Sequence, residues 1–115
     1  MLLLAAAFLC AAPAFHDGDN IRCNGGRAMR LAGIDAPEVA GSPKCERRRG
    51  RRADCDYRAG ARSRDHLRRI AAGRTVRCAQ LAIDKYGRPL VNCSAAGIGD
   101  LGEAQVRAGQ ARRWR

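Results

Sequence analysis

The segment from residue 20 to residue 34 most constrains the fold, because it has the pattern of a β-hairpin. Apolar residues alternate with polar ones on both sides of an Asn-Gly-Gly turn at residues 24–26. These apolar residues are Ile21, Cys23, Met29 and Leu31. If Met29 and Leu31 face a core, Arg30 between them faces the opposite side of the sheet. The hairpin therefore predicts a sheet with one apolar face and an arginine on the other.

Two later segments have the spacing of amphipathic helices. The first covers residues 57–72, and its small and apolar residues share one face. They are Ala59, Ser63, Leu67 and Ile70. Gly60 costs roughly 1 kcal/mol relative to alanine inside a helix, which favours a start further along the chain. The second helix begins after Asp100, which forms a capping box with Glu103, and it ends at Gly109.

The remaining regular segments are strands. Residues 75–78 and 88–93 have strand character and are joined across residues 84–87. The order of elements is thus strands, a helix, strands and a helix, in a chain of 115 residues that suits one domain. This order is typical of an α+β fold in which two helices pack against a small barrel.

The first 14 residues, MLLLAAAFLCAAPA, are apolar and end in an A-x-A pattern. We interpret residues 1–14 as a signal peptide and residues 15–115 as the folded domain, which predicts a secreted or periplasmic protein. The alternative is a buried first strand. Because the run is too short for a membrane span, we expect no stable membrane association. We also expect a monomer.

Charge points to the class of partner. Lysine and arginine number 22 against 11 acidic residues, and the formal net charge is +11. This excess favours polyanions such as nucleic acid. Five arginines lie in the loop at residues 39–58, where they suit either a solvated loop or a contact with a nucleic-acid backbone. They are Arg47, Arg48, Arg49, Arg51 and Arg52.

Cysteines are unusually frequent for so small a chain, which favours disulfides in an oxidising compartment. Five follow residue 14, and none forms a C-x-x-C pair, which argues against a zinc site. Cys45 and Cys55 are the favoured disulfide because they are close in sequence. A bridge between Cys78 and Cys93 on neighbouring strands would leave Cys23 as a buried thiol.

Three short motifs, HDGDN, RLAGIDAPE and DKYGR, occur in this order at residues 16–20, 30–38 and 84–88. Each alone is an ordinary turn or strand end. Together, at this spacing, they closely resemble the motifs of the staphylococcal nuclease (thermonuclease) family, and DLGEAQVRAGQA resembles the family's helix after the barrel. Among family members the chain looks most like the secreted bacterial ones with several cysteines.

The resemblance implies a five-stranded OB-type barrel with two helices, here incomplete at both ends, and calcium-dependent hydrolysis of DNA and RNA. The implied Ca²⁺ ligands are the side chains of Asp19 and Asp35 and the backbone carbonyl of Ala36. Asp17 would support them. Asn20 stands where the family usually has threonine, whose hydroxyl helps to organise the metal loop.

The resemblance also assigns roles in catalysis and in substrate binding. Glu38 would be the general base, and Arg30 and Arg88 would hold the phosphate. Lys85 and Tyr86 would line the nucleotide pocket, with a single-stranded or locally opened substrate. The chemistry is consistent, because a hard cation and guanidinium groups offset the repulsion between an anionic nucleophile and a phosphodiester. The alternative function is a non-catalytic or weakly active OB-type module that binds nucleic acid.

Overall fold

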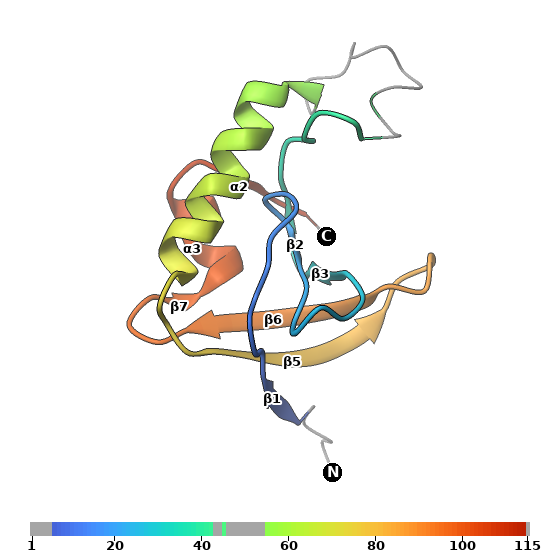
Figure 1. Ribbon diagram of the computed structural model, residues 1–115. Coiled ribbons are helices and arrows are strands. Elements are labelled where there is room, and N and C mark those ends of the chain that lie inside the picture. Colours follow the sequence, from blue (N-terminus) through green and yellow to red (C-terminus); the bar gives the residue numbers. More distant parts are fainter. Residues whose placement is uncertain (1–5, 43–44, 46–54, 115) are drawn as a thin grey trace.

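The computed structural model describes residues 6–42, 45 and 55–114. Two helices lie together near one end of the long β5–β6 pair (Figure 1). The turn that joins β5 to β6 is at the other end of this pair. The helices are α2 (Tyr57–Ala71) and α3 (Leu101–Arg107). The strands are β1 (Ala7–Leu9), β2 (Asn20–Ile21), β3 (Met29–Leu31), β4 (Ile34–Asp35), β5 (Val76–Ile83), β6 (Pro89–Ala95), β7 (Gly99–Asp100) and β8 (Arg112–Arg113).

The main sheet has the strand order β1-β5-β6-β3-β2, with β7 paired to β6, and β4 pairs with β8 in a separate two-stranded sheet. The predicted α+β fold with two helices is confirmed. Over the described residues the sheet stays open, with β1 and β2 at its edges, so the barrel is incomplete. The β3–β6 pair is parallel, whereas the other pairs of the main sheet are antiparallel.

The predicted hairpin is present. Strands β2 and β3 pair Ile21 with Met29 and Asn20 with Arg30. Asn24 has a positive φ of 52° and is followed by a glycine that also has a positive φ, as a tight turn requires. Leu31 is buried in the core at 1% exposure. Arg30 lies on the opposite face of β3, as the period of two predicts.

Helix α2 covers Tyr57–Ala71, so the predicted helix over residues 57–72 is confirmed. Its N-cap Asp56 accepts hydrogen bonds from the backbone N–H groups of Arg58 and Ala59, so the expectation of a later start is wrong. Gly60 is buried, and a Cβ at this position would overlap the backbone carbonyl oxygen of Glu38. The glycine therefore allows the helix to approach the loop that follows β4.

The buried face of α2 combines small and large residues. The predicted face is correct at Ser63 and Leu67, both fully buried, and it also includes Ala71. Leu67 packs into a core shared by all the main strands and by α3. That core includes Phe15, Ile21, Leu31, Val76, Val91 and Leu101.

The N-terminal segment takes part in the sheet. Strand β1 pairs with β5 in the register Phe8 to Cys78, and Cys10 beyond it is bonded to Cys23. Residues 7–9 thus form a first strand, as in the alternative interpretation, but this strand is exposed or half-buried and not buried. Removal of residues 1–14 as a signal peptide stays a prediction.

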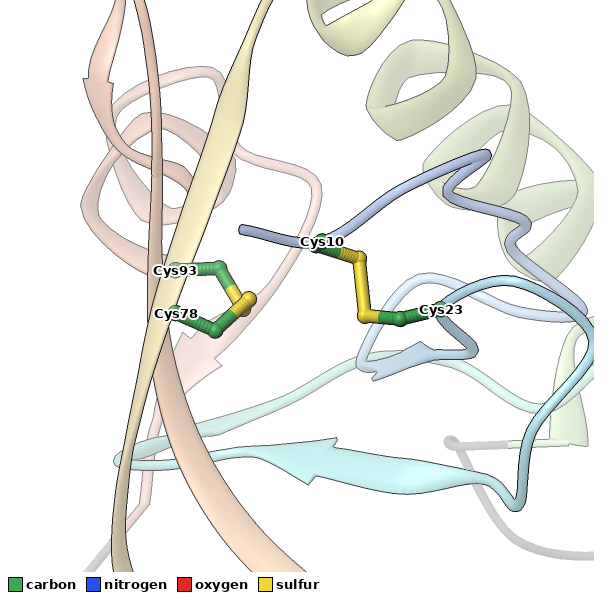
Figure 2. The surroundings of a disulfide bond; sticks show 4 residues. All are labelled: Cys10, Cys23, Cys78 and Cys93. Carbon is green, nitrogen blue, oxygen red and sulfur yellow. A yellow bond between two sulfur atoms is a disulfide. The ribbon is translucent and has the colours of Figure 1, made fainter. Parts of the chain in front are cut away.

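Three disulfides join the described cysteines: Cys10–Cys23, Cys45–Cys55 and Cys78–Cys93. The last two were predicted, whereas the expectation that Cys23 is a buried thiol is wrong. Figure 2 shows the Cys10–Cys23 and Cys78–Cys93 bonds next to each other inside the molecule, and the sulfur atoms of Cys10, Cys23 and Cys78 lie within 4.8 Å of one another. Each disulfide joins cysteines that are 10 to 15 residues apart in sequence. Closing a loop of this length stabilises a fold by about 3 kcal/mol, which matters in a small domain.

Within the described residues, neither helix has the length and hydrophobicity that crossing a bilayer requires.

We predict that Gly60→Ala destabilises the protein, although alanine is the better helix former. Its Cβ would overlap the Glu38 carbonyl oxygen, and the backbone must shift to relieve the overlap. We expect a loss of roughly 1–3 kcal/mol in urea unfolding. Gly102→Ala in α3 is the matched control, because the atom nearest to its Cβ would be a side-chain oxygen of Asp100 at 3.2 Å, with no overlap on the backbone. Equal effects of the two substitutions would contradict the proposed contact.

Candidate active site

The loop from Asp17 to Asn20 is organised by its own carboxylates. The Asp17 carboxylate accepts hydrogen bonds from the backbone N–H of Asp19 at 3.2 Å and from the Asn20 side-chain amide at 2.8 and 2.9 Å. The Asn20 amide also donates to Asp19 at 3.3 Å. Asn20 therefore provides hydrogen bonds within the loop.

Helices α2 and α3 hold this loop from behind. A Cβ at Gly18 would overlap the Ser63 hydroxyl, so the loop lies directly against α2. The fully buried Gln105 of α3 donates from its amide to the backbone carbonyls of Gly18, at 2.9 Å, and of Ser63, at 3.0 Å. Its side-chain oxygen is in turn hydrogen-bonded to His66. The position of the acidic loop thus depends on two helices that are far from it in sequence.

Arg30 brings Asp19 and Asp35 together. Its Nη1 atom lies 3.5 Å from Oδ2 of Asp19, and its Nη2 atom lies 3.3 Å from Oδ1 of Asp35. Nη2 also donates to the carbonyl of Ile34 at 3.0 Å, which fixes the guanidinium against β4. The carboxylates of Asp19 and Asp35 thus lie on either side of a single guanidinium group, and each is in contact with it. The fold therefore gathers three of the predicted site residues.

Asp19 is buried, with its side chain 3% exposed. Its Oδ2 atom accepts a hydrogen bond from the backbone N–H of Ala36 at 2.9 Å, so the peptide unit before Ala36 lies beside the carboxylate. Burial, followed by the nearby charge of Asp17, raises the pKa of Asp19 to about 8, while Arg30 acts in the opposite direction. A buried acid with so little compensation costs folding free energy and is typical of a functional site.

Asp35 has a second arginine partner that sequence reasoning missed. Nη2 of Arg112, on β8, lies 3.2 Å from its Oδ2 atom. The pairing of β4 with β8 sets this contact, because Asp35 is directly opposite Arg112 in the register. The basic C-terminal sequence does not indicate which acidic residue Arg112 contacts, because Arg112 and Asp35 are 77 residues apart.

The Glu38 side chain is held by a residue outside this cluster. It is half-buried, and its Oε1 atom accepts a hydrogen bond from the Ser42 hydroxyl at 2.7 Å. Its backbone carbonyl packs on Gly60 of α2. Pro37 and the contact with the helix therefore restrict the backbone between Asp35 and Glu38.

The loop at residues 84–88 lies at the exposed turn between β5 and β6. The Asp84 carboxylate forms an ion pair with Arg88, at 2.8 Å from its Nε atom. It also accepts hydrogen bonds from the backbone N–H groups of Tyr86 and Arg88, each at 2.9 Å. The Lys85 ammonium lies 5.3 Å from the centre of the Tyr86 ring, which is 73% exposed. Arg27 ties this loop to the hairpin by donating to the Gly87 carbonyl at 2.6 Å.

Arg88 is thus paired with Asp84 and not with Asp19 or Asp35. The parallel register of β3 and β6 relates it to Arg30, because Leu90, two residues after Arg88, is opposite Arg30. Residues two apart on a strand share a face, and the step between them is about 7 Å. Arg88 and Arg30 therefore lie on the same face of the sheet.

The donor set suits a hard cation. Two carboxylates converge on one guanidinium, and oxygen ligands of this kind are those that Ca²⁺ prefers. The buried Oδ1 atom of Asn20 has no hydrogen-bond partner among the described residues, so the acidic loop has an oxygen available for a cation or its hydration shell. The described part of the chain contains one group of three acidic, histidine or cysteine side chains whose ligand atoms lie within 4.8 Å of one another. Its members are cysteines that already form disulfides.

Comparison with family models places residues 28–115 in a family described as staphylococcal nuclease homologue. The chain belongs to the staphylococcal nuclease homologue family. The matched region contains Arg30, Asp35, Ala36, Glu38, Lys85, Tyr86 and Arg88. Asp17 and Asp19 precede it, and their connection to it is the contact through Arg30. A search of curated proteins finds no match.

Family membership supports a nuclease or nucleic-acid-binding domain, and this agrees with the net charge of +11. The three disulfides are typical of proteins from oxidising compartments.

We predict that Asp19→Asn stabilises the metal-free protein at alkaline pH. Between about pH 4 and pH 8 the folded wild type keeps a proton that the unfolded chain has lost, so its stability falls as pH rises and levels off above about pH 8. Asparagine avoids this cost and still accepts the Ala36 N–H. In EDTA at pH 9 we expect its melting temperature to be about 5 °C higher, the shift that about 1 kcal/mol produces in a domain of this size.

The gap should close as the pH falls below about 4, where Asp19 is protonated in both the folded and the unfolded wild type. Asp84→Asn is the control with the opposite sign. Desolvation raises the pKa of Asp84, but the backbone N–H groups of Arg88 and Tyr86 and the Arg88 guanidinium outweigh it, so the pKa is lowered. Removing that carboxylate should reduce stability at pH 9. A loss of stability in both variants would contradict this account of Asp19.

Proposed function

We propose that the protein is a calcium-dependent nuclease that hydrolyses phosphodiester bonds in DNA and RNA. The observation that carries the proposal is the contact of one guanidinium, that of Arg30, with both Asp19 and Asp35 in a member of this family. A buried acid, a second acid and an arginine on one face of a strongly basic protein are suited to a cation and a phosphate together.

In this proposal Asp19, Asp35 and the backbone carbonyl of Ala36 hold Ca²⁺, and Asp17 orients the loop through its hydrogen bonds to Asn20. When bound, the ion would neutralise charge on the phosphate and bring the reacting groups together. The hydrogen bond from Ala36 to Asp19 supports this assignment, because it brings the third ligand's residue against the first. The unpartnered oxygen of Asn20 supports it as well.

Arg30 and Arg88 bind the phosphate and stabilise the charge that grows on its oxygens during the reaction. In the structure both arginines are paired with aspartates. Calcium on Asp19 and Asp35 would release Arg30 for the phosphate. Arg88, on the same face of the sheet, would exchange Asp84 for a phosphate oxygen, because a charged and planar guanidinium binds such oxygens in pairs.

Glu38 acts as the general base that takes a proton from the attacking water. Its attachment to the helix through Gly60 supports this role, since a base must be held at a fixed separation from the phosphate. The exposed Tyr86 and Lys85 contact the nucleotide, for which an accessible ring and a neighbouring ammonium group are suited. A single-stranded or locally opened substrate presents its bases to such a ring.

The protein acts outside the cytoplasm, in a secreted or periplasmic location. The disulfides support this proposal, because cytoplasmic reductants keep most thiols reduced. Extracellular calcium is also available there for a site built from two carboxylates and a carbonyl.

The test is digestion of plasmid DNA and of RNA with Ca²⁺ and with EDTA. We expect cleavage that requires Ca²⁺. Replacing Glu38 by glutamine should lower the rate by about 10²- to 10⁴-fold, because it removes the base and keeps the shape.

Asp65→Asn is the matched control for that variant. It removes one carboxylate from an exposed position of α2, and its activity should equal that of the wild type. Salt-dependent binding of DNA without cleavage by any divalent metal would exclude the nuclease and leave the nucleic-acid-binding module.

A further inference from the structure

Strand β8 is fixed to the site by three attachments. It pairs with β4, the neighbouring Trp114 donates its N–H to the Gly33 carbonyl at 2.8 Å, and Arg113 forms two contacts with the Glu103 carboxylate at 2.7 and 2.8 Å. The last contact joins β8 to α3. The backbone of Arg112 therefore has a defined position opposite Asp35.

The Arg112 side chain lies at the edge of a groove. The groove has a volume of about 290 Å³ and is lined by residues 35–37 on one side and residues 109–112 on the other. The side chain of Arg112 is 67% exposed, while that of its partner Asp35 is 12% exposed. The Arg112 guanidinium is thus accessible from solvent, and it contacts a carboxylate that is mostly buried.

We propose that Arg112 is a third phosphate-binding arginine, which neutralises Asp35 in the metal-free protein and binds the substrate phosphate once a cation occupies Asp35. The proposal rests on the proposed function and names a further substrate-binding residue for it. An exposed ion pair of this kind is weak, so exchange of its anion is easy.

The exchange follows from charge. Arg112 is within 3.2 Å of Asp35 Oδ2, the oxygen that Arg30 does not contact. A divalent cation held by Asp35 would compete with Arg112 for this carboxylate, because the cation and the guanidinium have the same sign of charge. The released guanidinium stays beside the groove because its backbone is held by β4, and there its two parallel N–H donors suit a phosphate.

This arrangement gives Arg112 opposite effects on the two ligands. It competes with the cation for Asp35 and attracts the anionic substrate. Removing its charge should therefore tighten calcium binding and weaken nucleic-acid binding. An arginine that only stabilised the fold would change both affinities in the same direction.

The experiment compares the wild type with Arg112→Gln by calorimetric titration with Ca²⁺ alone. We expect Ca²⁺ to bind about three- to tenfold more tightly in the variant, as loss of one partly screened positive charge near a divalent ion predicts. In a second titration, a fluorescent oligothymidylate is added with Ca²⁺ to Glu38→Gln protein with and without Arg112→Gln. Its affinity should fall about three- to tenfold, and the slope of log K against log salt should decrease by about 1.

Two further variants separate charge from structure. Arg69→Gln removes one positive charge from an exposed position of α2 and should change Ca²⁺ affinity little. Arg112→Lys keeps the charge and should restore both affinities most of the way to the wild-type values.

Unchanged Ca²⁺ affinity in Arg112→Gln, or a fall in both affinities, would overturn the proposal while leaving the proposed nuclease intact. Failure of the wild type to bind Ca²⁺ at all would instead overturn the metal site, and the competition at Asp35 with it.

Discussion

The close approach of helix α2 to two acidic loops is the contact on which the rest of the site depends. Gly18 lies against Ser63, and Gly60 lies against the carbonyl of Glu38, at positions where a Cβ would overlap its neighbour. These contacts fix the loop with Asp19 and the loop with Glu38 against one rigid element. Gln105 of α3 completes the support by bonding both Gly18 and Ser63. Small residues on a helix thus set the spacing of the charged ones.

The second constraint is electrostatic. Asp19 is buried beside Asp17, and its pKa is raised to about 8 because burial disfavours its charge. Arg30 offsets part of this cost by bridging Asp19 and Asp35. In the proposed function a divalent cation would offset much more. A cation bound in this way would lower the free-energy cost of ionising Asp19 in the fold.

The sequence predicted the fold wherever local pattern decides structure. Alternation placed Arg30 on the face opposite Leu31, and the capping box at Asp100 placed α3, where Asp100 accepts the Glu103 N–H. It failed where distant contacts decide. Gly60 was expected to destabilise α2, because its low helix propensity can be read from the local sequence. Its contact with the Glu38 backbone depends on the tertiary fold and could not be read in this way.

The same limit applies to the site. The motifs predicted that Asp19, Arg30 and Asp35 belong together, and the structure brings these three into contact. They did not predict that Arg88 pairs with Asp84, or that Arg112 reaches Asp35, because side-chain partners depend on register and on charge balance in the metal-free state. Cys23 was assigned as a thiol because its partner, Cys10, lies in a segment interpreted as a leader.

The central claim is that Asp19 and Asp35 form one cation site. A crystal structure of the protein grown with Ca²⁺ tests it most directly. The account predicts one ion bound by an oxygen from each of the two carboxylates and by the carbonyl of Ala36, with Arg30 no longer bridging the acids. An ion bound to only one of them, or found elsewhere while Arg30 still spans both, would contradict it.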